Sequence, residues 1–289
     1  MILKVALSAA ILAGAAACGT SKGESPTGPG SIPQPSSTVY YTAIGASDAI
    51  GFGSSVPCLP FTECPDGRGY VQVATRELRA RGLTVTLSNL GFPAQVLSRR
   101  LQDLGTRYGR IMTGNMIEEQ APFVQANTTL VTIFAGANDV DTIVAALGGG
   151  AGGSEQTAYI DSQIAAFGQD FAALLSMVRD RAPSARIVVV NLPNMAGMPR
   201  HAGASLQQRR AEQMLSVGIN TKVINPKVSN GVLVVDLMCD PRAYQASTYS
   251  SDGFHPSDIG YAWIAAEVIA AATTSYRAPA SGCSQAALV

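Results

Sequence analysis

Five short runs of apolar and β-branched residues recur along the chain, separated by more polar segments. Continuous apolar runs of this kind are typical of strands that are buried on both faces, as in a parallel sheet. The expected strands are Thr38 to Gly45, Leu83 to Leu90, Leu130 to Gly136, Arg186 to Leu192 and Val232 to Leu237.

Segments with the helical spacing of apolar residues lie between these runs. The expected helices include Val71 to Arg81, Gln95 to Leu104, Ala158 to Arg181, Leu206 to Ile224 and about Pro256 to Thr274. The alternation predicts an α/β fold, a three-layer sandwich around a five-stranded parallel sheet. The active site of such a fold is expected outside the carboxyl ends of the strands. The glycine-rich run from residue 148 to 153 is expected to be a flexible loop, because no Gly-Lys-Ser/Thr follows it.

The first 18 residues are typical of an export signal. A short positive start precedes Val5 to Ala17, which are apolar or small apart from one serine, and Cys18 follows. This stretch is too short to span a bilayer as a stable helix. Small residues that run into a cysteine resemble a bacterial lipobox, which implies lipid modification of Cys18; the alternative is a plain signal peptide cut near Ala17. The protein is expected to be exported, either lipid-anchored in the bacterial cell envelope or secreted.

Residues 19–37 are mostly Gly, Ser, Thr and Pro. Such a composition cannot bury enough apolar area to offset the entropy of ordering the chain. We therefore expect a flexible tether over residues 19–37 and one catalytic domain over residues 38–289. The length of 289 residues, 47% of them hydrophobic, supports one sizeable core.

Composition excludes several classes of function. Lys+Arg and Asp+Glu both number 20, and no run of basic residues offers a nucleic-acid surface. The two histidines and five cysteines contain no pair with zinc-ligand spacing, so no metal site is expected. Without Cys18, the four remaining cysteines suit an oxidising compartment. We expect Cys58 to pair with Cys64 and Cys239 with Cys283; the alternative is four unpaired buried thiols.

Polar residues and glycines follow the predicted strands. Ser47 follows the first strand, Gly91 the second and Asn138 the third, while Asp252 and His255 precede the last predicted helix. Together they supply a hydroxyl nucleophile, a base, a carboxylate to orient the base and donors for an oxyanion. Each residue alone has an ordinary explanation as a cap, a turn or a solvated loop. Their conjunction at strand ends predicts an acyl-transfer site.

The order of these residues resembles that of the SGNH hydrolases, or GDSL-type esterases and lipases, whose four marker residues fall on Ser47, Gly91, Asn138 and His255. The resemblance spans roughly residues 39–274 and implies a flavodoxin-like sheet. It also implies that Ser47 is the nucleophile and that Asp252 orients His255. The oxyanion would be held by the backbone N–H groups of Ser47 and Gly91 and by the side-chain amide of Asn138.

The sequence departs from this family pattern at one position, and a second stretch of the chain looks similar to the pattern. The family's Gly-Asp-Ser is Gly-Ala-Ser here, with Ala46 in place of the aspartate and Asp48 after the serine. The family's aspartate is not a triad member, so the expected chemistry stands. Ser205 lies in a Gly-Ala-Ser-Leu stretch, but a helical pattern follows and no strand precedes it, so we expect a helix N-cap. His201, the other histidine, is expected at the surface.

The sequence predicts a serine ester hydrolase that works through an acyl-enzyme and needs no cofactor. Apolar residues that could line a substrate groove are Ile50, Phe52, Phe92, Val140, Ile143, Met195, Met198 and Phe254, although core packing explains them equally well. Short- or medium-chain acyl esters or lipids are the favoured substrates. Carbohydrate-binding surfaces usually need exposed aromatic residues, and the single tryptophan, Trp263, lies within a predicted helix. The alternatives are a carbohydrate O-deacetylase acting on cell-wall or plant polysaccharide and a non-catalytic surface-binding lipoprotein.

Overall fold

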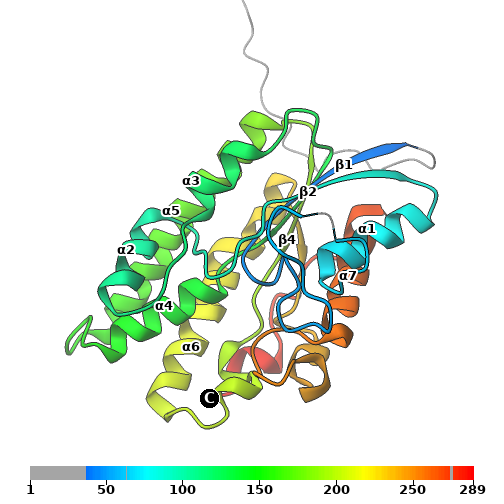
Figure 1. Ribbon diagram of the computed structural model, residues 1–289. Helices are drawn as coiled ribbons and strands as arrows, with labels where there is room; N and C mark the ends of the chain where they lie inside the picture. The colour runs from blue at the N-terminus through cyan, green and yellow to red at the C-terminus, as the bar shows by residue number, and fades with distance from the viewer. Residues whose placement is uncertain (1–36, 63, 274–275) are drawn as a thin grey trace, which may run out of the picture.

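The computed structural model describes residues 37–62, 64–273 and 276–289. The predicted export signal, with Cys18, and the predicted tether up to residue 36 lie outside the described residues. The described chain contains a five-stranded parallel sheet with helices on both faces (Figure 1). The predicted α/β sandwich is therefore confirmed.

All five predicted strands are present, in the sheet order β2-β1-β3-β4-β5 that is typical of flavodoxin-like folds. They are β1 (Thr38–Gly45), β2 (Thr84–Asn89), β3 (Leu130–Phe134), β4 (Arg186–Val190) and β5 (Leu233–Val235). β3 and β4 end two residues earlier than predicted, because Phe134 and Val190 are the last residues that pair with a neighbouring strand. The residues released from pairing build loops at the carboxyl edge of the sheet.

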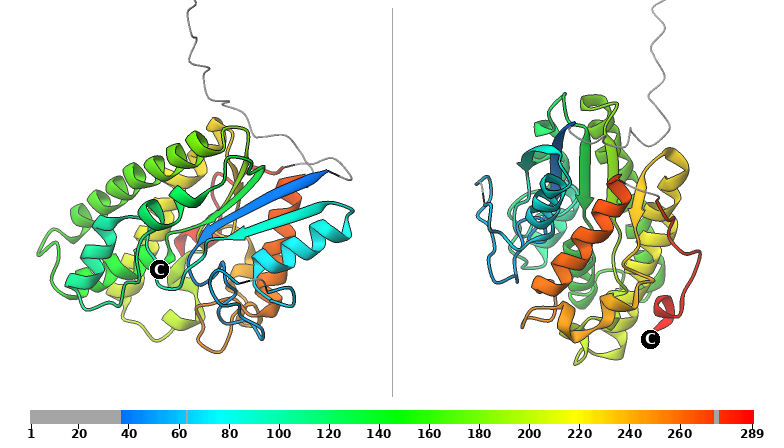
Figure 2. Two further views of the ribbon diagram at one scale, coloured as in Figure 1. Left: turned by 45° about the horizontal axis from the view of Figure 1, so that its top comes forward. Right: turned by 90° about the vertical axis from the view of Figure 1, so that its right-hand side faces the viewer.

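The helices form the two outer layers. α1 (Tyr70–Ala80) and α7 (Asp258–Thr273) pack together on one face of the sheet (Figures 1 and 2). The other face is covered by α2 (Arg99–Arg107), α3 (Met116–Glu119), α4 (Ala137–Gly148), α5 (Gln156–Arg181) and α6 (Leu206–Ile219). Short 3₁₀ or π turns lie at Ala121–Phe123, Met195–Gly197, Pro199–His201, Asn220–Ile224, Asn225–Asn230, Pro241–Tyr244, Ala246–Thr248 and Ser284–Ala287.

Helix α4 is not among the predicted elements. It begins at Ala137, directly after the sheet, because Gly136 with φ +119° lets the chain turn sharply from strand to helix. The helix continues to Gly148, so the expected glycine-rich loop is limited to the turns that follow. This sharp turn places Asn138 in the first turn of a helix at the carboxyl edge of the sheet.

Two predicted helices have different bounds in the structure. α2 begins later than predicted, because Val96 pairs with Asn115 in a β-bridge and keeps the preceding segment extended. The α-helical part of α6 ends at Ile219 and continues as a π turn. Pro226, which lacks the N–H group that an α-helix requires, follows that turn.

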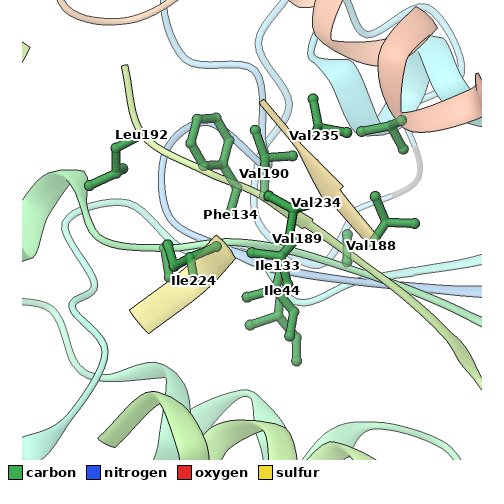
Figure 3. Close-up of a cluster of buried hydrophobic side chains, with 14 of the residues drawn as sticks. Ile44, Ile133, Phe134, Val188, Val189, Val190, Leu192, Ile224, Val234 and Val235 are labelled. Carbon is green, nitrogen blue, oxygen red and sulfur yellow. The ribbon is translucent and has the colours of Figure 1, made fainter. Parts of the chain in front are cut away.

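Buried aliphatic and aromatic side chains pack around the central strands (Figure 3). Close packing holds such side chains in fixed positions, so the loops at the carboxyl edge start from rigid anchor points. The cluster includes Ile44, Ile133, Phe134, Val188, Val189, Val190, Leu192, Ile224, Val234 and Val235.

Two disulfide bonds are present, Cys58–Cys64 and Cys239–Cys283, as predicted. Disulfide bonds are typical of proteins that fold outside the reducing cytoplasm, which supports export. The first bond closes a short loop after β1, and the second ties the C-terminal tail to the loop after β5. Within the described ranges, no helix is both long and apolar enough to cross a membrane.

Candidate active site

Ser47 lies directly after β1, where the chain leaves the sheet. Gly45, the last residue of the strand, is held by the buried side chain of Gln120: its Oε1 accepts from the Gly45 N–H at 2.9 Å, and its Nε2 donates to the Gly45 carbonyl at 2.8 Å. A turn follows, in which the Phe52 N–H donates to the Ser47 carbonyl at 3.0 Å. Ser47 is thereby fixed beside the reversal of strand order between β2, β1 and β3, where open parallel sheets bind ligands.

The loop before α7 brings a histidine and a carboxylate to this serine. His255 Nε2 lies 2.9 Å from Ser47 Oγ, and His255 Nδ1 lies 2.6 Å from Asp252 Oδ2. The Ser250 N–H donates to the His255 carbonyl at 2.8 Å, and Gly253 adopts a φ of +67° that favours glycine. The structure thus brings together the three side chains predicted from the sequence, in one chain of hydrogen bonds.

The carboxyl group of Asp252 is held in its ionised form. Burial by itself raises the pKa of Asp252, but hydrogen bonds from the His255 ring, from the N–H groups of Phe254 and His255 and from the Ser250 hydroxyl lower it well below the usual range. A carboxylate at Nδ1 favours the imidazole tautomer whose unprotonated Nε2 faces the serine. The arrangement can remove a proton from the Ser47 hydroxyl.

Gly91, a predicted oxyanion donor, lies beside the loop that carries Ser47. A Cβ added to Gly91 would lie 2.5 Å from Ala49 Cβ and 3.3 Å from the Ala46 carbonyl oxygen, so only glycine fits here. Its N–H donates to Asn89 Oδ1 at 3.0 Å. The Ser47 N–H makes no hydrogen bond within the described part of the chain. Of these two backbone donors, one is uncommitted and the other must exchange its partner to reach a substrate oxygen.

Asn138, the third predicted donor, lines a cavity of about 10 Å³ together with Ala46 and Asp48. Its Nδ2 donates to the Gln95 backbone carbonyl at 2.9 Å, rather than to its own loop. A carboxamide nitrogen carries two hydrogens. One amide hydrogen therefore orients Asn138 and the other remains to donate to a substrate.

Several buried polar residues that hold these donors were missed by the sequence analysis. Gln120 Nε2 donates to Gln95 Oε1, which links the end of β1 to the segment beneath Asn138. Asp139 Oδ1 accepts from the Leu97 N–H at 2.8 Å, and Oδ2 has no hydrogen-bond partner among the described residues. Burial raises the pKa of Asp139 to about 6. No sequence signal marks the two glutamines, because their partners are distant along the chain.

An apolar cavity of about 40 Å³ lies beside the loop that carries His255. It is bordered by Phe254 and Pro256, the two neighbours of His255, and by Asp48, the neighbour of Ser47. Burial raises the pKa of Asp48, and the nearby His255 partly offsets this increase. A cavity of this volume exceeds the space that one water molecule needs. Its further walls include Phe134, Leu192, Met195, Met198 and Trp263.

The residues that could line a groove divide into three groups. Met195, Met198 and Phe254 line the apolar cavity. Phe52 is exposed, and its ring centroid lies 4.6 Å from that of His255. Phe92 is half-buried, and its ring centroid lies 6.0 Å from that of Phe61. The remaining three have the core packing that was the alternative explanation, since their side chains are buried and do not line this cavity: Ile50, Val140 and Ile143.

The Gly-Ala-Ser-Leu stretch around Ser205 has a structural role, and His201 is buried. Ser205 caps α6, and its side chain accepts from the Gln208 N–H at 3.2 Å, as predicted. The prediction that His201 lies at the surface is wrong, because His201 Nδ1 pairs with Glu212 Oε1 at 2.9 Å inside the domain. Over the described ranges, no group of three or more His, Cys, Asp or Glu residues is placed to hold a metal ion.

Comparison with protein families now identifies the class of the chain. Residues 43–263 match the model of the GDSL-like lipase/acylhydrolase family, and the chain belongs to this family. Ester hydrolysis is the activity that the family's description names. A comparison with curated proteins found no match.

Solved structures share the fold. They include the lipase Lip_vut3 from a goat rumen metagenome, with 17% identity, a TM-score of 0.56 and coverage of 82% of this chain and 98% of that chain. The extracellular lipase from Streptomyces rimosus has 20% identity, a TM-score of 0.52 and coverage of 81% and 100%. A putative GDSL-like lipase from Parabacteroides merdae has 15% identity, a TM-score of 0.53 and coverage of 83% and 97%. At these identities the similarity concerns the fold.

Proposed function

We propose that the protein is an exported serine esterase that hydrolyses esters of short- or medium-chain carboxylic acids, lipids included, through an acyl-enzyme on Ser47. The observation that carries this proposal is the chain of hydrogen bonds from Ser47 Oγ through His255 to Asp252, at 2.9 and 2.6 Å. Hydroxyl, imidazole and carboxylate in this geometry are the arrangement that activates a serine nucleophile.

In the proposed mechanism, Ser47 Oγ attacks the ester carbonyl carbon while His255 Nε2 takes the hydroxyl proton. The negative charge that develops on the carbonyl oxygen is stabilised by the N–H groups of Ser47 and Gly91 and by the amide of Asn138. Collapse of the tetrahedral intermediate breaks the bond to the alcohol, which leaves with the proton from His255. A water molecule then attacks the acyl carbon while His255 Nε2 takes its proton. The bond between the acyl carbon and Ser47 Oγ breaks, Ser47 regains a proton from His255, and the carboxylic acid leaves.

The acyl preference rests on the apolar cavity that borders the loop carrying His255. Phe254, Pro256 and Asp48, which form part of its wall, are the chain neighbours of His255 and Ser47. Its volume of about 40 Å³ favours a short apolar chain over a sugar ring. Its lining is mostly apolar, and apolar surface contributes to binding in proportion to the area removed from water.

The test is a series of p-nitrophenyl esters of increasing acyl length, measured beside an acetylated polysaccharide, with Ser47→Ala as the inactive control. We expect turnover to be highest for short or medium chains and to be lost in Ser47→Ala. A strong preference for the acetylated polysaccharide would instead indicate a carbohydrate O-deacetylase. Absence of hydrolysis of every ester would indicate a binding module that retains the fold.

We also propose that Cys18 carries a lipid that anchors the exported domain to the cell envelope. The proposal rests on the small residues that run into Cys18 and on the residues rich in Gly, Ser and Pro that follow. Mass spectrometry of the protein from a bacterial host should find a lipid-modified N-terminus at Cys18, and Cys18→Ser should release the protein or block its processing. An unmodified N-terminus elsewhere would contradict the anchor.

A further inference from the structure

The carboxyl group of Asp48, which follows the proposed nucleophile in the chain, has no step in the proposed mechanism and no partner in the fold. Only 8% of the residue is exposed. Among the described residues, this carboxyl group accepts no hydrogen bond from another residue, and the one donor beside it is its own backbone N–H. A buried polar group without a partner costs free energy. Asp48 is therefore a candidate for contact with a ligand.

Nearby polar side chains do not supply the missing partner. The hydroxyl groups of Tyr249 and Tyr261 lie near Asp48, because burial raises their pKa values and the charge of Asp48 adds to the increase. Both hydroxyl groups donate instead to backbone carbonyl oxygens, at 2.6 and 2.7 Å. His255 also lies near Asp48, but its ring nitrogens are already bonded to the serine and the aspartate of the candidate site. The carboxyl group is left for a partner from outside the chain.

Asp48 borders two cavities, together with Phe134 and Ala137. One is the apolar cavity of about 40 Å³, which we call the acyl cavity after the function proposed for it. The other is the cavity of about 10 Å³ that Asn138 also lines. The amide of Asn138 is the proposed donor to the ester carbonyl oxygen. Asp48 therefore borders the acyl cavity at the end where the ester carbonyl is expected.

The rest of the acyl cavity wall offers no second free polar side chain among the described residues. Thr248 Oγ1 donates to two backbone carbonyls, at 2.9 and 2.7 Å. Burial raises the pKa of Asp240, and Arg242, with a smaller contribution from the Trp263 N–H, lowers it below its usual range. The Trp263 N–H makes no hydrogen bond by distance and angle in the described ranges, but this effect places it toward Asp240, which does not line the cavity.

The volume and the single carboxyl group narrow the chemistry of the ligand. The volume of about 40 Å³ is roughly three times the space that one water molecule needs, which suits a short chain with one polar substituent. A hydroxyl group both donates and accepts, so it pairs with the carboxyl group in either protonation state. An ammonium group would bring three donors to one acceptor group, and an ionised Asp48 would repel a carboxylate or a phosphate.

We propose that Asp48 is a specificity-determining residue, whose carboxyl group hydrogen-bonds a hydroxyl group on carbon 2 or 3 of the acyl chain. This inference rests on the proposed esterase function and names its substrate class as esters of short hydroxylated carboxylic acids. The hydroxyl position follows from the place of Asp48, which borders both the acyl cavity and the cavity lined by Asn138. The carboxyl group is costly in the free protein and gains its partner when the substrate binds.

The test compares four soluble esters of equal chain length by titration of the released acid. They are methyl butyrate, methyl 2-hydroxybutyrate and the two enantiomers of methyl 3-hydroxybutyrate. We expect wild type to hydrolyse at least one hydroxylated ester with a kcat/KM about tenfold or more above that of methyl butyrate, because butyrate leaves the carboxyl group unpaired. A carboxyl group in a fixed position should also distinguish the two enantiomers.

Two variants of Asp48 and one control assign the preference. Asp48→Leu removes the acceptor and should make methyl butyrate the better substrate by about tenfold, because the hydroxyl group would then enter an apolar wall. Asp48→Asn keeps an acceptor and a donor and should retain part of the preference. The matched control is Met198→Leu, which changes the cavity wall at nearly constant volume and should change kcat/KM for all four esters by the same factor.

Thermal unfolding separates specificity from folding. Removal of an unpaired buried carboxyl group should leave the Tm of Asp48→Leu and Asp48→Asn equal to that of wild type or above it. A lower Tm, together with an equal loss of kcat/KM on all four esters, would make Asp48 a structural residue and would overturn the inference.

Two further outcomes would overturn it. The first is hydrolysis of methyl butyrate by wild type at least as fast as that of every hydroxylated ester, which would leave a water molecule as the partner of Asp48. The second is a preference for the hydroxyl group that persists in Asp48→Leu, which would assign its recognition to another residue. Both outcomes leave the esterase function standing, because methyl butyrate is still hydrolysed. Absence of hydrolysis of these esters and of every p-nitrophenyl ester would contradict the proposed function and this inference with it.

Discussion

The two histidines of the chain, His255 and His201, each lie beside a carboxylate. Ser47 lies next to His255 in space, and Ser205 lies close to His201 in sequence. Only His255 is part of a chain of hydrogen bonds from serine to carboxylate. His255 makes bonds on both ring nitrogens, to Asp252 and to Ser47. His201 makes one, to Glu212, and its Nε2 has no hydrogen-bond partner among the described residues. Residue types alone therefore do not distinguish a catalytic group from a structural one.

The regions around His255 and His201 differ in solvent access and in the position of the serine. The His255 loop lies at the carboxyl edge of the sheet, and Asp252 is partly exposed. The His201–Glu212 pair is buried, and Ser205 hydrogen-bonds the Gln208 N–H as a helix cap. A histidine without contact to solvent or to a hydroxyl cannot exchange protons with a substrate, so its pairing stabilises the fold.

The largest difference between the regions is expected at the serine itself. Ser47→Ala removes the nucleophile and should lower kcat on a p-nitrophenyl ester by about 10⁴- to 10⁶-fold. The residual rate should come from the oxyanion donors and substrate binding. Burst kinetics should show no acyl-enzyme in this variant. Substantial turnover in Ser47→Ala would assign the nucleophile to another residue.

The next effect concerns Asn138, whose amide is oriented by Gln95. A donor directed at developing negative charge contributes more in the transition state than in the bound ester. Asn138→Ala should lower kcat by roughly 10²- to 10³-fold, about 3–4 kcal/mol, with KM little changed. Near-normal turnover in this variant would show that Asn138 only ties α4 to the segment at Gln95.

Glu212 should show the opposite pattern, with an effect on stability and none on chemistry. Its Oε1 accepts from His201 and from Gln208 at 2.8 Å, and removal leaves a buried imidazole without its partner. Glu212→Ala should lower the free energy of unfolding by about 2–4 kcal/mol. Chemical denaturation measures this loss, and kcat of the folded enzyme should stay within about threefold. Glu212→Gln, which keeps an acceptor, should lose less; a large loss of kcat would give this region a catalytic role.

A buried carboxyl group that forms no ion pair among the described residues should make the free energy of unfolding depend on pH in the opposite direction to a paired carboxyl group. Burial raises the pKa of Asp139 to about 6 in the folded state, against about 3.9 when unfolded. From about pH 4 to pH 6 the folded state binds more protons, so stability falls as pH rises. Asp139→Asn keeps an acceptor for the Leu97 N–H and should raise the free energy of unfolding at pH 7 by up to about 3 kcal/mol.

Urea unfolding at pH 4 and pH 7 tests this prediction. The two proteins should differ little at pH 4, where the folded Asp139 carboxyl is neutral in wild type. The exposed Asp103→Asn serves as the control and should change stability little at either pH. Equal stability of Asp139→Asn and wild type at pH 7 would contradict the burial effect.

The strands and the residues of the candidate active site were predictable because their signals are local. Buried strands are continuous apolar runs, and Ser47 and His255 sit in short motifs at the ends of elements. The burial of His201 was not predictable, since it depends on Glu212 in the following helix. Gln120 was missed for the same reason, because it reaches Gly45 across 75 residues of chain.

Helix α4 shows a second limit of the sequence. Its start depends on the positive φ of Gly136, which allows a strand to turn directly into a helix. No side-chain cap marks this start. The predicted strand was therefore extended into residues that build the turn before Asn138.

The smallest expected effect is at Ser205, which completes the comparison between the two regions. Its side chain accepts from the Gln208 N–H at 3.2 Å and satisfies one of the free donors at the start of α6. Ser205→Ala should therefore cost at most about 1 kcal/mol of stability as a lost cap, and kcat should stay within about a factor of two of wild type. Thermal unfolding and hydrolysis of a p-nitrophenyl ester, measured beside Ser47→Ala, provide both readouts. If Ser205→Ala abolished turnover and Ser47→Ala did not, the active site would lie at the buried histidine and the assignment of the two regions would be reversed.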